Sequence, residues 1–392
     1  GQELPCFALT GPYAGSDAAS LPDHGVVCYG EHEGERVLGL RITWEKRYIT
    51  LAPVATVLGL AFQASDPDHI LGDEAELGIT LALIPTEHPG VNIGRRHYPS
   101  GQAFMNGPNW GTDVFIPMSM VIGGQAQLGQ GWRMLMNCLA AGRAISLPAM
   151  GTSAAKHAAR LTGAYARIRK QFKLPIGKLE GVEEALARIG GEAYSLEAAR
   201  RLTCVALDQG HEPAVVSAML KYRATEGMRN TLTDAMDVHG GRGICLGPSN
   251  YLAAGYQGIP VGITVEGANI LTRSLIIFGQ GAMRCHPWLL KEIQAAQNPD
   301  KERGLSEFDT ALGGHTRYFI CNLARAIVLN LSGGRLLPAP VAGPNSRWYR
   351  EATRSSTNFA LVSDLALMIL AGELKRREKL SGRFADILVE LY

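Results

Sequence analysis

The stretch Leu38-Gly-Leu-Arg-Ile-Thr-Trp-Glu45 alternates large apolar residues with glycine or polar residues. This period of two is typical of a strand that buries one face. Other short apolar runs lie at 26–29, 79–84 and 114–116, and Gly, Pro, Asp and Asn clusters separate them. Turn-forming residues at such close intervals predict a small antiparallel β-sandwich or barrel over residues 1–125.

The pattern changes to a helical one in the middle of the chain. From Ala154 to Phe172 the apolar residues recur in steps of four and three, and Thr152 or Ser153 is placed to cap the helix. A second helix is expected through Val182–Leu196, and a third follows Pro213. Long helices with short connections predict a four-helix-type bundle over residues 126–296.

A third region, 297–392, begins at the turn-forming residues Gln297–Lys301. Residues 316–331 and 350–374 have helical patterns, and the chain ends in a further helical pattern. We therefore expect an α+β protein, in which a small antiparallel β domain precedes a helical bundle and a helical extension. Because neither end carries a typical terminus, we expect the chain to be a fragment, truncated within the extension.

Composition excludes several classes of protein. Of the 392 residues, 46% are hydrophobic and 19% are charged, which is typical of a globular protein. The net charge of +2 without a dense basic block argues against nucleic-acid binding. The seven cysteines are scattered singly, which favours a reducing compartment and argues against a disulfide framework or a metal site.

The best candidate catalytic residue is Glu266, in the apolar and glycine-rich stretch 262–273. Apolar surroundings raise the pKa of a carboxylate, and the following Gly267 lets the backbone approach a ligand closely. A general base needs these conditions to take a proton from carbon. The alternative is a carboxylate that only stabilises the positive end of a helix.

Three other segments have a functional and a structural interpretation each. The glycine turn in Phe7–Asp17 could hold a phosphate or a ring edge, or could simply connect two strands. Arg169 could clamp a pyrophosphate, or could be a solvated arginine at a helix end. The segment His239-Gly-Gly-Arg-Gly243 could admit a flat ligand, or could only end a helix. Arg143 is similarly open.

Together these segments resemble the acyl-CoA dehydrogenase family from residue 1 to about residue 295. Phe7–Asp17 resembles the flavin-binding strand and turn, and Trp44–Thr50 resembles the motif beside the flavin ring. Arg169–Phe172 resembles the segment whose arginine reaches the FAD of a neighbouring subunit, and Asp237–Gly241 the Gly-Gly segment near the adenosine. Glu266-Gly267 matches the Glu-Gly of the catalytic base.

The resemblance implies a set of site residues. FAD contacts are expected at Phe7, Leu9, Thr10, Gly15, Ser16, Tyr48, Ile49, Thr50, Arg169, Gln171, Phe172, Gly240, Gly241, Ala268 and Asn269. Substrate contacts are expected at Ser16, Arg143, Gly267 and Arg273. The sequence departs from the family pattern at Ala268, where many members carry a threonine, and at Lys173, where a glycine is usual.

The activity that the resemblance implies is FAD-dependent α,β-dehydrogenation of fatty acyl-CoA to trans-2-enoyl-CoA, the first step of β-oxidation. Glu266 would take the α-proton while a hydride passes to flavin N5. The alternatives are an acyl-CoA oxidase that uses oxygen, and a non-catalytic module that binds flavin or acyl-CoA.

The resemblance also implies partners and a location. From Phe308 onward the chain resembles the long bacterial acyl-CoA dehydrogenases, whereas the family's N-terminal helical domain is not represented in it. We expect an electron-transfer flavoprotein or a similar acceptor, a homo-oligomer, and no nucleic acid. The expected location is the cytoplasm, where the extension could also touch the inner membrane.

Overall fold

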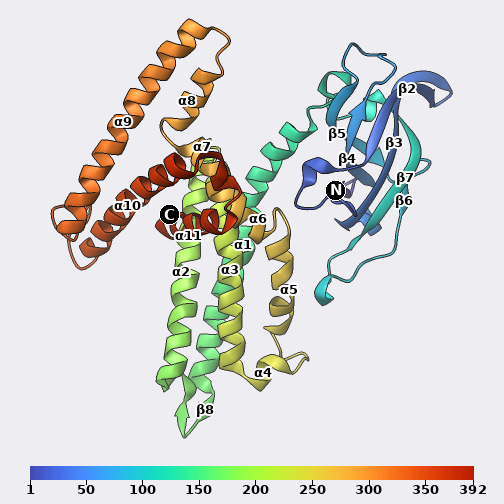
Figure 1. Ribbon diagram of the computed structural model, residues 1–392. Coiled ribbons are helices and arrows are strands. Elements are labelled where there is room, and N and C mark those ends of the chain that lie inside the picture. The colour runs from blue at the N-terminus through green and yellow to red at the C-terminus, as the bar shows by residue number, and fades with distance from the viewer. The chain divides into compact units, whose positions relative to one another are not determined.

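The computed structural model describes residues 1–392, apart from the side chains of residues 140 and 141 (Figure 1). The chain divides into two compact units. Unit 1 comprises residues 1–142 and 232–266, and unit 2 comprises residues 143–231 and 267–392.

Unit 1 contains a curled seven-stranded sheet. Its strands are β1 (Pro5–Ala8), β2 (His24–His32), β3 (Glu35–Thr50), β4 (Val57–Ser65), β5 (Glu76–Pro85), β6 (Asn92–Ile93) and β7 (Asn106–Pro117). The hydrogen-bonded neighbours follow the order β1-β4-β2-β3-β7-β6. Strands β1 and β2 share one edge of β4, and β5 pairs along its other edge. With the helices that follow, this sheet confirms the predicted α+β class.

The sheet is mixed, so the prediction of a purely antiparallel sheet was wrong. Both β1 and β2 run parallel to β4. Pro5 pairs with Val57 near one end of β4, and His24 pairs with Gln63 near the other end. The two strands therefore follow each other along one edge of β4, and the connection between them must leave the sheet and return. Alternation along a strand shows which face is buried but not the direction of its neighbours.

The predicted alternation in β3 is confirmed. Leu40, Ile42 and Trp44 are buried in the core of the sheet, whereas Arg41 and Glu45 are exposed. The curled sheet thus closes around one apolar face. On the opposite face, side chains of β4 and β5 form a second buried apolar cluster with Ala14, Leu21 and Leu135.

The helices of the bundle belong mainly to unit 2. They are α1 (Gly131–Ile168), α2 (Glu180–Asp208) and α3 (Ala214–His239). Small side chains at Ala155, Ala193 and Ala224 let these helices pack closely. Thr152, predicted as a cap, is instead buried inside α1, whose helix begins 21 residues earlier at Gly131. The sequence 131–151 lacks the clear period that marks the second half of the helix.

Shorter helices follow α3. These are α4 (Gly241–Ile244), α5 (Ala253–Thr264), α6 (Asn269–Leu271), a π-helical segment (Thr272–Gln280), α7 (Gly281–Cys285) and α8 (Leu289–Ala296). The extension forms α9 (Lys301–Leu331), α10 (Ser346–Leu370) and α11 (Glu378–Leu391). These three helices correspond to the helical patterns predicted for the extension.

The extension packs into unit 2 through aromatic side chains. Phe278 of the π-helical segment stacks on Phe384 of α11, with ring centroids 4.4 Å apart, and Phe359 of α10 meets both rings edge-on. This packing buries the apolar face of α11 against the bundle. The extension is thus part of unit 2.

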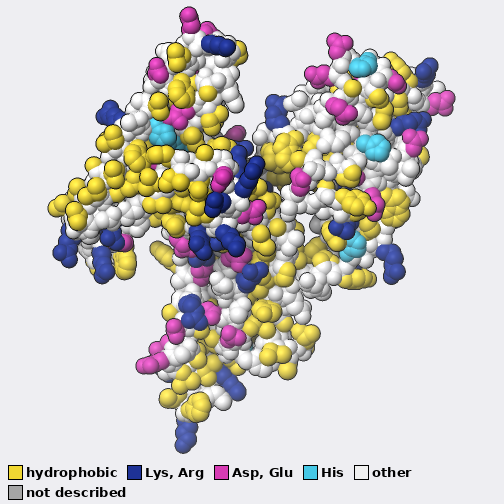
Figure 2. Space-filling model, in the orientation of Figure 1, with side chains coloured by type: hydrophobic (Ala, Val, Ile, Leu, Met, Phe, Trp, Pro, Cys, Tyr) yellow, Lys and Arg dark blue, Asp and Glu magenta, His cyan; other side chains and the backbone are white. Residues whose placement is uncertain are grey.

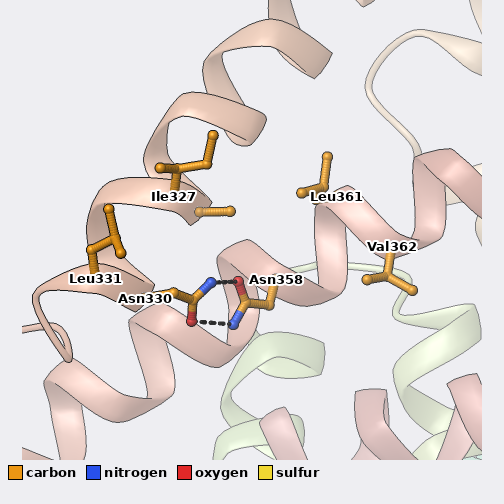
Figure 3. Close-up of a pocket in the computed structure, with 7 residues that line it drawn as sticks. Ile327, Asn330, Leu331, Asn358, Leu361 and Val362 are labelled. Atoms are coloured by element: carbon orange, nitrogen blue, oxygen red, sulfur yellow. Dashed lines mark hydrogen bonds between the residues drawn. The ribbon is translucent and has the colours of Figure 1, made fainter.

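Helices α9 and α10 leave apolar side chains in solvent, and Figure 2 shows them as an almost continuous band. An open groove of about 400 Å³ lies between the two helices (Figure 3). At its floor the side-chain amides of Asn330 and Asn358 exchange two hydrogen bonds, of 2.8 and 3.1 Å. By length and composition alone, Ser346–Lys375 could cross a membrane, although soluble proteins also contain such helices.

A glycine in β3 offers a test of the close packing in the sheet. A Cβ atom added at Gly39 would overlap the backbone oxygen of Ile116 on β7. We expect Gly39→Ala to reduce the free energy of unfolding by ~1–3 kcal/mol, as overpacked sites do. At Gly163 in α1 no described heavy atom lies within 4 Å of the added Cβ. Gly163→Ala should therefore stabilise the protein by ~0.5–1 kcal/mol in urea unfolding, and equal effects of the two changes would contradict this account.

Candidate active site

The connection between β1 and β2 carries the predicted flavin turn and is fixed by the neighbouring strand β3. The backbone N–H of Arg47 donates to Thr10 O at 3.0 Å, and its guanidinium donates to Pro12 O at 3.1 Å. Within the turn, Gly11 N–H donates to Ala14 O at 3.0 Å. The turn is therefore a defined backbone structure at the edge of the sheet.

A buried ion pair is linked to the start of the same turn by a hydrogen bond. Lys46 of β3 is 0% exposed, and its ammonium forms an ion pair with Asp23 and donates to Leu9 O at 2.9 Å. Asp23 also accepts from the backbone N–H of Glu45 at 2.9 Å. Burial lowers the pKa of Lys46, and the hydrogen bond and charge of Asp23 oppose that change. Neither residue of the pair was identified from the sequence, although Lys46 interrupts an otherwise amphipathic strand.

The end of β3 presents the predicted ring-contacting residues. The pairing between β3 and β7 shifts register between Lys46 and Ile49, which is a β-bulge. Within the bulge Tyr48 has a φ of +61°, and its ring is 57% exposed beneath the guanidinium of Arg47. Ile49 is buried and Thr50 is exposed. The bulge therefore turns an aromatic ring outward just before Thr50.

His239 has a structural position at the end of α3. Its Nδ1 lies 2.8 Å from Ala235 O and its Nε2 lies 2.7 Å from the hydroxyl of Tyr251. Burial lowers the pKa of the imidazole, which favours the neutral ring. The next residue, Gly240, has a φ of +55° and ends the helix before Gly241 begins α4. The neutral ring thus fixes this turn, since Nδ1–H donates to Ala235 O and Nε2 accepts from the Tyr251 hydroxyl.

Glu266 lies in unit 1, in the short connection between α5 and α6. Its φ is +55°, and that of Gly267 is +92°. Two consecutive residues in the left-handed region are unusual, and a non-glycine residue there carries a cost of order 1–3 kcal/mol. Such strain persists only where the surrounding structure holds it, and it occurs often at functional sites. Glu266 precedes α6 by three residues and is itself outside a helix.

The residues after Glu266 belong to unit 2 and are held by buried polar contacts. Lys221 of α3 donates to Gly267 O at 2.7 Å and to Asn269 Oδ1 at 2.8 Å. A Cβ at Gly267 would lie 3.2 Å from Thr272 Oγ1 and 3.7 Å from an Arg143 guanidinium nitrogen. The structure therefore brings Arg143 and Gly267, two of the predicted substrate contacts, close together.

Two of the predicted contact residues form hydrogen bonds or ion pairs with other side chains of the protein. Arg273 forms a bidentate ion pair with Asp386 of α11, at 2.7 and 2.5 Å. The amide of Asn269 is only 3% exposed, and it lies among polar side chains of α3, so it faces the protein rather than solvent. The adjacent Ala268 has no side-chain polar group with which to replace the usual threonine.

The predicted pyrophosphate-binding segment forms a short β-hairpin with a two-residue turn after α1. Strands β8 (Lys170–Gln171) and β9 (Leu174–Pro175) are joined by Phe172 and Lys173, whose φ values are +51° and +65°. This conformation explains why a glycine is usual at the position of Lys173. The side chain of Phe172 is 86% exposed, and Arg169 at the start of the hairpin is also exposed. The hairpin therefore presents an aromatic ring and a guanidinium to solvent.

His286 of the α7–α8 connection, His315 of α9 and Asp364 of α10 form a cluster with the spacing of a metal site, but its hydrogen bonds do not suit a metal. His286, His315 and Asp364 offer ligand atoms within 4.8 Å of one another. However, His286 Nδ1 accepts the backbone N–H groups of Trp288 and Leu289, at 3.2 and 3.0 Å. The neutral ring then carries its proton on Nε2, 2.8 Å from Asp364 Oδ1. A nitrogen that bears a proton does not ligate a metal, so we interpret the cluster as a hydrogen-bonded tie.

The fold is an α+β architecture in which a curled sheet precedes a helical bundle. Two family models match the chain: "Acyl-CoA dehydrogenase, C-terminal domain" at residues 129–278 and "Acyl-CoA dehydrogenase, C-terminal, bacterial type" at residues 283–392. The chain belongs to the acyl-CoA dehydrogenase family.

Individual relatives cover the chain to different extents. Protein HemX of Proteus mirabilis is 54% identical over 104 residues, which are 26% of this chain and 61% of that protein. Probable acyl-CoA dehydrogenase FadE10 of Mycobacterium tuberculosis is 24% identical over 99% of this chain and 58% of its own length. The crystal structure of an acyl-CoA dehydrogenase from Bacillus anthracis complexed with FAD has a TM-score of 0.73 at 20% identity. The match covers 99% of this chain and 60% of the Bacillus anthracis protein. The chain therefore spans about 60% of the length of these relatives.

Proposed function

We propose that the protein is an FAD-dependent dehydrogenase of fatty acyl-CoA thioesters, in which Glu266 is the base that removes the α-proton. The observation that carries this proposal is the conformation of Glu266-Gly267. The two residues have φ values of +55° and +92° within the region that matches the family. Backbone strain of this kind occurs often at functional sites, and a carboxylate held there could act as a general base.

The backbone of the predicted cofactor segments is compatible with FAD. Apart from the adjoining backbone and chain neighbours, no described heavy atom lies within 4 Å of a Cβ built at Gly15, Gly240 or Gly241. A ligand can therefore approach these peptide groups closely. Tyr48 and Phe172 present exposed rings for stacking. Bound FAD would supply the acceptor for the β-hydrogen, which leaves as a hydride.

The residues of the chain would perform three tasks. Glu266 would accept the α-proton on its carboxylate, and its backbone N–H would donate to the thioester oxygen as enolate character develops. Ser16 would contact both cofactor and thioester. Arg169 would neutralise phosphate charge, which its planar guanidinium does well.

The proposal extends to partners and location. An electron-transfer flavoprotein or a similar acceptor would reoxidise the cofactor, and a homo-oligomer would allow the exposed β8–β9 hairpin to reach a neighbouring subunit. A cytoplasmic protein with a fatty acyl-CoA substrate is consistent with its seven free cysteines.

The direct test is an anaerobic titration of the flavin-loaded chain with acyl-CoA of several chain lengths. We expect the visible band of oxidised flavin to disappear, with one trans-2-enoyl-CoA formed for each flavin reduced. Binding of acyl-CoA without loss of the band would instead indicate a non-catalytic binding module. Stoichiometric peroxide during aerobic turnover would indicate an acyl-CoA oxidase.

A further inference from the structure

A fully buried lysine lies against the segment that follows Glu266. Lys221 of α3 is 0% exposed. Lysines are almost never fully buried, because removing an ammonium from water is costly. Both of its contacts described above, to Gly267 O and to Asn269 Oδ1, are on residues within three positions of Glu266. The ammonium thus donates to one backbone oxygen and one side-chain oxygen of the short segment Gly267–Asn269.

The neighbouring residues of α3 hold the same stretch. Asn269 Nδ2 donates to Thr225 Oγ1 at 2.9 Å and to Glu226 Oε1 at 2.8 Å. Thr225 lies one helical turn after Lys221, so both side chains lie on the same face of α3. On the other side, Thr272 Oγ1 donates to Gly267 O at 3.1 Å. The carbonyl of Gly267 and the amide of Asn269 are therefore each held by two or more residues.

We propose that Lys221 is a positioning residue for the catalytic base. It fixes the peptide after Glu266 and the start of α6, so that the left-handed backbone at 266–267 is kept and the Glu266 carboxylate has one direction. This inference rests on the proposed role of Glu266 as the base. A lysine suits the task because its ammonium is a donor at the end of a long stem and can bridge two acceptors.

The first measurement is hydrogen exchange of the amides in residues 266–272, on the chain without flavin. Lys221→Met keeps much of the volume but removes every donor. We expect exchange in this segment to become at least about tenfold faster, because a hydrogen bond to a charged group is lost from two acceptors. Leu220→Ala is the matched control, since Leu220 is also buried in α3. It should lower overall stability without a selective change in 266–272.

The second measurement separates positioning from binding. In the flavin-loaded chain, Lys221→Met should lower kcat by about 100-fold, as expected for a misplaced reacting group. The dissociation constant of acyl-CoA should change little. The isotope effect of α-deuterated substrate should increase, because proton removal becomes more strongly rate-limiting. A merely structural role would not change the isotope effect beyond that of Leu220→Ala.

The outcomes are distinct. Wild-type exchange in 266–272 of Lys221→Met, or a loss of kcat equal to that of Leu220→Ala, would overturn the inference. If Lys221→Met does not fold, Lys221→Gln retains an uncharged amide NH2 on a shorter side chain, and its exchange should lie above the wild-type rate; an unchanged rate again contradicts the role. If Glu266→Gln retained turnover, the proposed function would fail, whereas the exchange result would still report on Lys221.

Discussion

Glu266→Gln is expected to slow the reduction of flavin by acyl-CoA by roughly three orders of magnitude, within the range that general-base catalysis contributes. That loss corresponds to about 4 kcal/mol of transition-state stabilisation. Glutamine has nearly the same shape as glutamate but cannot accept the α-proton. Rapid-mixing measurements of the flavin band after addition of acyl-CoA give the rate directly. Flavin content and acyl-CoA affinity should change little.

The matched control is Glu183→Gln, which also removes one negative charge but from the exposed first turn of α2. We expect its rate of flavin reduction to equal that of the wild type. Reduction of flavin by Glu266→Gln at the wild-type rate would show that another group removes the proton. A loss of flavin from the same variant would instead assign Glu266 to cofactor binding.

The sequence predicted those parts of the fold that depend on local pattern. The alternation around Leu40 and Ile42 was sufficient to identify β3 and its buried face, because side-chain direction has a period of two along any strand. It could not show that β1 and β2 both run parallel to β4, since this pairing joins residues more than 35 positions apart. The result matters for function, because it forces the turn after Ala8 out of the sheet.

The candidate site likewise contains some residues that the sequence indicated and others that it did not. Glu266 and Gly267 could be identified from their residue types and order, and the structure adds the left-handed backbone that the sequence does not reveal. Lys46 and Lys221 were missed because a lysine is normally assigned to a solvated surface. One signal was present: Lys221 follows Ala218-Met-Leu220, where a run of apolar residues continues on both faces of the helix.

Lys46→Met is expected to reduce the free energy of unfolding by ~3–5 kcal/mol, the usual cost of leaving one partner of a buried ion pair uncompensated. Asp23 would remain buried with the backbone N–H of Glu45 as its donor, and Leu9 O would lose its hydrogen bond from Lys46. Because Leu9 begins the predicted flavin turn, the ratio of bound flavin to protein should fall as well. Chemical denaturation measures the first effect, and the absorbance of the purified protein measures the second.

A double variant separates the effect of the uncompensated charge on stability from the effect of the lost Leu9 O hydrogen bond on flavin binding. Asp23→Asn combined with Lys46→Met removes both charges, and the asparagine oxygen can still accept from Glu45 N–H. Since the uncompensated charge is then gone, the double variant should be destabilised by only ~1–2 kcal/mol, which is the net value of the remaining hydrogen bonds. Its flavin content should stay low, because Leu9 O still lacks its donor from β3. A Lys46→Met variant as stable as the wild type would mean that water reaches Asp23, and a double variant with full flavin content would mean that Lys46 does not shape the turn.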